Sequence, residues 1–165
     1  MAANIASGAT AKVLSLMQGV NGINASVSAM LQVGVPGGPS AVVEVTAQNV
    51  AADLVERSSA MRYPAATIYC EKVVNSLGEK FRSFSGHVEM TIEVRHSQDG
   101  LDGLESALEL YADAAAQALD ATRGDWGNGM FYAGGYEISF GTVKRGGRGF
   151  VQAARINFDV VVSKS

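Results

Sequence analysis

The chain has 165 residues, a formal net charge of −3 and one cysteine. With 47% hydrophobic and 18% charged residues, it has the composition of a globular domain rather than that of a disordered chain. The single cysteine, Cys70, excludes an internal disulfide framework and a cysteine-rich zinc site. The acidic balance argues against a broad surface that coats nucleic acid.

The first third of the chain differs from the rest, because all twelve aromatic residues lie at or beyond Tyr63. We therefore expect one domain in two parts: an N-terminal helix with a glycine-rich arm over residues 1–62, and an α+β core over residues 63–165. Small residues interrupt every apolar run near the N-terminus. This pattern argues against a secretory signal and against a membrane span. We expect a soluble protein made in a reducing cytoplasm.

Apolar residues at helical spacing predict a helix over residues 5–20. They are Ile5, Ala9, Val13, Leu16 and Val20. Residues 21–41 contain a PGGP turn cluster and predict a mobile loop or arm that carries at most one short strand. A strand over residues 42–45 and a helix over residues 49–59 are also predicted.

The core begins with two predicted strands. Residues 66–74 follow Pro64 and are rich in β-branched and aromatic side chains. Residues 87–96 alternate strictly, which predicts a strand with one buried and one wet face. The apolar positions are Val88, Met90, Ile92 and Val94.

A stripe of leucine, alanine and tyrosine predicts a helix over residues 101–122, with Asp102 and Glu105 as a capping box. A strand near residues 136–144, the turn RGGRG at 145–149 and a long final strand from Phe150 predict a hairpin. The predicted fold class is α+β: a four-stranded, mainly antiparallel sheet packed on a long helix, with an N-terminal helix and an extended loop or arm.

Motifs of catalysis do not occur in the chain. It has no phosphate-binding glycine loop, nucleophile elbow or zinc-protease pair. His87 and His96 fall on opposite faces of one strand, so they cannot hold one metal ion together, and we expect Cys70 to act as a small buried hydrophobe. The sequence predicts no catalytic residue, no metal, no cofactor and a protein that is not an enzyme.

Charge is segregated along the chain. Residues 89–125 hold nine acidic and two basic residues, a net charge of −7. Three of the acids, Glu105, Glu109 and Asp113, share one helix face, and three bases follow at Lys144, Arg145 and Arg148. The pattern has two interpretations: simple solubility, or an assembly in which the basic tip of one subunit meets the acidic face of the next. On the second interpretation these six residues are candidates for a subunit or tube interface.

The order of elements resembles that of the tail terminator and head–tail joining proteins of long-tailed bacteriophages. The likeness rests on Tyr63-Pro64-Ala65 before a strand, the strand end Val94-Arg95-His96, the helix 101–122, the link Gly124-Asp125-Trp126 and the closing hairpin. The resemblance implies a structural virion protein, made in the host bacterial cytoplasm, that forms a ring, commonly a hexamer. Such a ring ends polymerisation of the tail tube and joins the tail to the head. The implied partners are further copies of the chain, the tail-tube protein and the head–tail connector protein, with no membrane, and DNA passes through the ring.

Two other hypotheses stay open. One is a tail-tube or baseplate subunit. The other is a small α+β ligand-binding domain or enzyme, which would need a concave pocket with convergent polar groups. The basic tip could also face the DNA channel, but three basic residues would give only weak contact with phosphates, so we favour a protein interface.

Overall fold

The computed structural model describes residues 4–32, 43–48, 62–146 and 149–165. Within these ranges the helices are α1 (Ile5–Gln18), α2 (Ile23–Gln32) and α4 (Leu104–Asp120). The strands are β1 (Glu44–Ala47), β2 (Ala65–Asn75), β3 (Phe84–Gln98), β4 (Gly124–Gly127), β5 (Met130–Tyr132), β6 (Glu137–Phe140), β7 (Lys144–Gly146) and β8 (Gly149–Lys164).

The strands form one eight-stranded sheet in the order β1-β2-β3-β8-β5-β4, and β6 and β7 also pair with β8. β1 runs parallel to β2, whereas the other pairs are antiparallel, so the sheet is mixed. The predicted fold class, a four-stranded sheet packed on a long helix, is therefore wrong. The prediction missed β4 and β5 because three or four residues are too few to display an alternating pattern.

The predicted strand 136–144 is divided into β6 and β7. Phe140 pairs with Ala154 and Lys144 pairs with Val151, so three residues on one side face two on β8. This extra residue is a bulge, and it interrupts the ladder between the two short strands.

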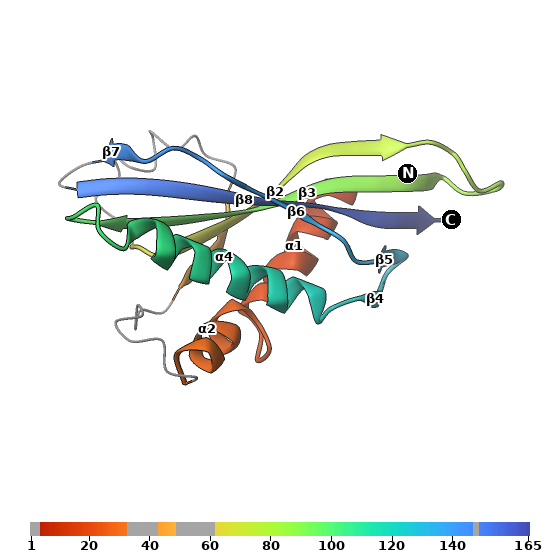
Figure 1. Ribbon diagram of the computed structural model, residues 1–165. Helices are drawn as coiled ribbons and strands as arrows, with labels where there is room; N and C mark the ends of the chain where they lie inside the picture. The colour runs from red at the N-terminus through yellow and green to blue at the C-terminus, as the bar shows by residue number, and fades with distance from the viewer. Residues whose placement is uncertain (1–3, 33–42, 49–61, 147–148) are drawn as a thin grey trace.

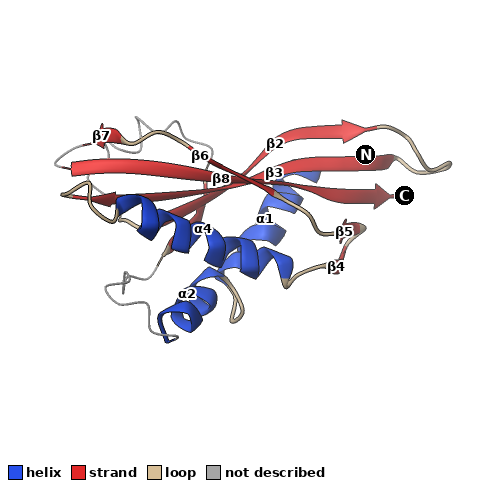
Figure 2. Ribbon diagram, viewed as in Figure 1, coloured by secondary structure: helices blue, strands red, loops and turns tan. Residues whose placement is uncertain are grey.

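The three described helices, α1, α2 and α4, lie on the same side of the twisted sheet (Figures 1 and 2). We call that side the helix-covered face. It is lined by buried side chains of the two long central strands, namely Val88, Met90, Ile92 and Val94 of β3 and Ile156, Phe158 and Val160 of β8. The opposite side, which carries His87, Glu89, Thr91, Glu93 and Arg95 of β3, is called the polar face.

The predicted helix 101–122 is found as α4, and its apolar stripe is buried against β3 and β8. The capping box is wrong. The residue before the helix is Gly103, at a φ of 81°, and no side chain caps the first turn. That left-handed backbone conformation is one that glycine adopts without steric cost, so a glycine rather than Asp102 precedes the helix.

The N-terminal third takes more regular structure than predicted. The first helix is found as α1, but residues 23–32 form the helix α2 where a loop or arm was expected. Met17 and Ile23 join the same core as α4. The strand predicted at 42–45 is found slightly later, as β1, and the predicted helix 49–59 lies outside the described residues. Of the helices the structure describes, none is both long and apolar enough to cross a membrane.

Candidate subunit interface

The basic tip predicted from the sequence lies at an edge of the sheet. Lys144 and Arg145 belong to β7, and both are exposed. Arg148 lies outside the described residues. Register explains the position: Arg145 pairs with Phe150 and Gly146 with Gly149, so the two cations lie beside the first residues of β8.

The acidic ridge of α4 is also exposed. Glu105, Glu109 and Asp113 all face solvent, while Leu108 and Tyr111 between them are fully buried. The helical spacing that predicted one acidic ridge therefore separates it from the buried stripe. The ridge is on the helix-covered side, and β7 lies toward the end of the sheet at which α4 begins (Figure 1).

The two charged groups do not neutralise each other inside one subunit. Among the residues that the structure describes, none of the salt bridges involves Lys144, Arg145 or the three ridge acids. Exposed unpaired charges of opposite sign on different surfaces are available to a second molecule.

Large apolar side chains accompany the basic tip. Tyr136, Phe140 and Val143 have 43%, 46% and 39% of their surface exposed. They lie in and beside β6 and β7, whose partner among the described strands is β8 alone. We call the segment from Tyr136 to Gly146 the outer edge. It combines apolar side chains and two cations with strand backbone that pairs with β8 on one side and with no described strand on the other.

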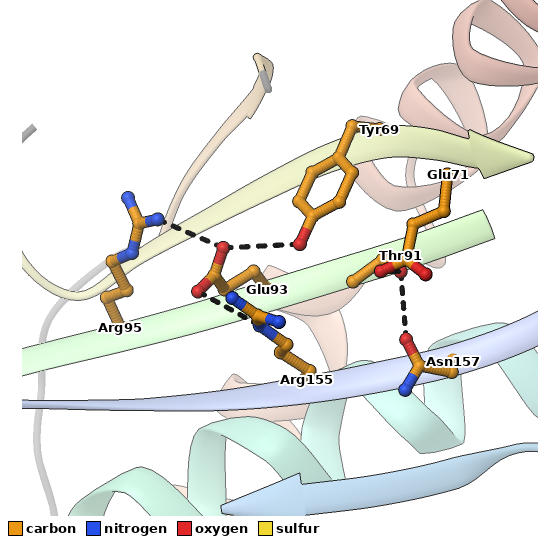
Figure 3. A network of polar contacts seen from close by, with 7 residues as sticks. All are labelled: Tyr69, Glu71, Thr91, Glu93, Arg95, Arg155 and Asn157. Carbon is orange, nitrogen blue, oxygen red and sulfur yellow. Dashed lines mark hydrogen bonds and ion pairs between the residues drawn. The ribbon is translucent and has the colours of Figure 1, made fainter. Parts of the chain in front are cut away.

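The polar face contains a buried ion-pair network that the sequence analysis did not find (Figure 3). Glu93 is the centre: its side chain is 6% exposed, and Arg95 donates to its carboxylate at 3.0 Å. Arg155 lies 3.5 Å from the second carboxylate oxygen, and the Tyr69 hydroxyl donates at 3.5 Å. A carboxylate out of water needs such partners, so this network satisfies Glu93.

A second polar group adjoins the network (Figure 3). The Thr91 hydroxyl oxygen lies 2.8 Å from a carboxylate oxygen of Glu71 and 2.8 Å from the amide oxygen of Asn157. One hydroxyl proton serves only one acceptor. Rotation of the Asn157 amide by half a turn places its NH2 against Thr91, which satisfies all three groups.

The network shifts two pKa values. Burial, and then the charge of Glu93, raise the pKa of Tyr69. The Glu93 carboxylate raises the pKa of Arg155. Both shifts favour the forms that bind Glu93, the neutral phenol as donor and the charged guanidinium as counter-ion.

The predicted wet face of residues 87–96 is wrong at its centre, since Thr91, Glu93 and Arg95 are all buried. Alternation shows which residues share a face but not whether that face is covered. One signal was present in the sequence. Glu93 and Arg95 carry opposite charges at the spacing that puts two strand residues on one side.

The histidines and the cysteine lie apart from one another. His96 packs on Tyr111 of α4, with ring centroids 5.3 Å apart, and burial lowers its pKa. His87 is on the polar face beside Glu89, so the prediction of opposite faces is confirmed. Cys70 is half-buried rather than buried, and desolvation raises the pKa of its thiol, which makes it a poor nucleophile at neutral pH.

A comparison with protein-family models finds none that matches this chain, and a comparison with curated protein sequences also finds no match. We therefore infer the function from the geometry of the outer edge and the acidic ridge, together with the resemblance in element order.

Proposed function

We propose that the protein is a structural subunit that assembles with further copies of itself into a closed ring. The observation that carries this proposal is the outer edge. It presents three large exposed apolar side chains and two cations along strands that pair with β8 on one side and with no described strand on the other. Such an edge promotes aggregation of a monomer, because it pairs readily with other chains. A specific partner that covers the edge prevents this.

The contact in this proposal is head-to-tail. The basic tip and the acidic ridge are different surfaces of one subunit, so the tip of one copy meets the ridge of the next. Repetition of a head-to-tail contact gives a ring when the rotation closes and a filament when it does not. Charge complementarity sets the register, while the apolar side chains of the outer edge supply buried area.

We assign the ring to the neck of a long-tailed bacteriophage, where it ends the tail tube and contacts the head–tail connector. Support for this step comes from the resemblance in element order around Tyr63-Pro64-Ala65, the helix α4 and Gly124-Asp125-Trp126. The proposed role is structural and needs no catalytic residue, which agrees with the sequence prediction that the protein is not an enzyme.

A charge swap tests the head-to-tail contact. Lys144→Glu with Arg145→Glu should abolish ring assembly, because it puts like charges against the ridge. Glu105→Lys with Glu109→Lys should abolish it in the same way. When all four substitutions are combined in one chain, the attraction is restored with its polarity reversed, and rings should return. Size-exclusion chromatography with light scattering measures each outcome.

The matched control is Lys80→Glu with Arg82→Glu, two exposed cations in the loop between β2 and β3 at the opposite end of the sheet (Figure 1). This variant should still form rings. Intact rings in the Lys144 and Arg145 variant would contradict the interface. Filaments of the unaltered protein would favour a tail-tube subunit over a terminator.

A further inference from the structure

Three potential metal ligands, none of which belongs to the outer edge, converge on the polar face. They are His87 and Glu89 of β3 and Asp159 of β8, and their ligand atoms all lie within 4.8 Å of one another. Register explains the convergence. His87 and Glu89 are two residues apart and so share a face, and Asp159 is the direct cross-strand partner of Glu89. The two longest strands thus fix the positions from which the three side chains extend.

The surroundings of this cluster are negative. Glu89 and Asp159 also line a hollow of about 400 Å3, together with Glu71, Glu137 and Asn157. The one cation paired with Glu89 among the described residues is Lys72, whose ammonium nitrogen lies 3.8 Å from the carboxylate. Glu89 also lies 3.6 Å from His87 Nε2. A bound cation would therefore enter a site with a surplus of carboxylates, one of which Lys72 already neutralises in part.

We propose that His87, Glu89 and Asp159 form a binding site for a divalent transition-metal ion such as Zn²⁺. One imidazole and two carboxylates make three protein ligands, which leaves positions for water. The imidazole favours zinc and its transition-metal neighbours over magnesium and calcium, which prefer oxygen ligands only. Because the ligands come from β3 and β8, the ion bridges the two central strands. Two of the ligands share a hollow with Tyr136 and Glu137 of the outer edge, but none of the three belongs to the outer edge or the acidic ridge, so this proposal does not rest on the ring.

Nuclear magnetic resonance of the imidazole groups tests the site directly, because the chain has only two histidines. Titration with Zn²⁺ should shift the ring resonances of His87 and leave those of His96, which is packed on Tyr111, unchanged. Isothermal titration calorimetry should give one ion per chain. Zinc at a hundredfold excess over its Kd should raise Tm by about 5–10 °C, because the ion binds only the folded state.

Substitutions separate a defined site from general attraction of cations to acidic groups. His87→Ala and Asp159→Asn should each weaken zinc binding by more than about tenfold. Lys72→Met should tighten binding by about fivefold, because it removes the ammonium group that competes for Glu89. Lys80→Met is the matched control, since Lys80 is an exposed lysine in the loop after β2, and it should leave the affinity unchanged.

Three results would overturn the proposal. They are an absence of zinc binding, binding that His87→Ala leaves unchanged, and equal shifts of both histidines during the titration. Circular dichroism of His87→Ala checks that the variant is folded. Ring assembly that persists in this variant leaves the proposed function intact, so the two proposals succeed or fail separately.

Discussion

Buried side chains on the two faces of the sheet are stabilised by different kinds of contact. On the helix-covered face, Ile92 and Ile156 belong to the same apolar core as the buried stripe of α4, and their exposed fraction is zero. On the polar face, the residue after Ile92 is Glu93, which is almost as well buried but depends on Arg95 and Arg155. At two neighbouring positions, β3 therefore contributes an apolar side chain to the core and a carboxylate to an ion-pair network. Only the ion-pair network requires particular partner groups.

The two kinds of surface differ in whether their contacts are made within one subunit. The apolar contacts of the helix-covered face close within one subunit. The polar face and the outer edge instead leave Arg155, Lys144 and Arg145 exposed to other molecules. We therefore expect substitutions on the first face to change stability, and those on the outer edge to change assembly.

The largest effect on stability should come from the helix-covered face. Leu108→Ala removes a side chain with no exposed surface and should lower the free energy of unfolding by about 4 kcal/mol. Leu101→Ala is the control, because that leucine is 57% exposed, and it should change the free energy by less than about 0.5 kcal/mol. Urea denaturation measures both. Equal effects would contradict the claim that the buried stripe of α4 stabilises the fold.

The polar face should be nearly as sensitive at its centre. Glu93→Ala leaves the buried Arg95 without this carboxylate and should cost about 3 kcal/mol. Glu89→Ala, on the same strand and face but 37% exposed, should cost less than about 1 kcal/mol. If thermal denaturation shows the two variants to be alike, the network around Glu93 does not stabilise the fold.

Two buried tyrosines predict a loss of stability in alkali. Burial raises the pKa of Tyr111 and of Tyr132 to about 12, from 10.0 in the unfolded chain. The folded state therefore holds these protons more tightly than the unfolded chain does. The resulting contribution to the free energy of unfolding is full below pH 10 and is lost as the pH rises towards 12. Ionisation of each tyrosine should lower the free energy of unfolding by about 1 kcal/mol at pH 11. The double variant Tyr111→Phe with Tyr132→Phe should flatten the measured profile; an unchanged profile would contradict the assignment.

Removal of the hydroxyl group from either of these tyrosines should have the smallest effect on stability at neutral pH, and the two effects should differ in sign. The Tyr132 hydroxyl donates to the Gly135 carbonyl at 3.1 Å, so Tyr132→Phe should lower the free energy of unfolding by about 1 kcal/mol. The Tyr111 hydroxyl is buried without a hydrogen-bond partner among the described residues. Tyr111→Phe should therefore be neutral or stabilising by up to about 1 kcal/mol. Urea denaturation of both variants at pH 7 tests the sign.

Sequence periodicity was sufficient for the elements with long, regular patterns. It placed β3 and α4 because their apolar residues repeat over many positions. It failed for α2, whose small and polar residues resemble a loop and whose burial comes from packing against α4. It also failed for β4 and β5, which are too short for a period to show, and this is why the predicted sheet had too few strands.

The candidate sites divide in the same way. The ridge of Glu105, Glu109 and Asp113 follows from helical spacing, so the sequence contained it. The cluster of His87, Glu89 and Asp159 was missed, because Asp159 reaches it through the pairing of β3 with β8. No local pattern specifies the register of two strands that are distant in the chain.

In the proposed assembly, the outer edge and the acidic ridge join copies of this chain into a closed ring. Negative-stain electron microscopy of the purified protein can show whether such rings form. We expect closed rings of uniform diameter that dissociate as salt is raised, because screening weakens the contact between tip and ridge. Separate monomers at concentrations well above those used for imaging, or open filaments without rings, would contradict it.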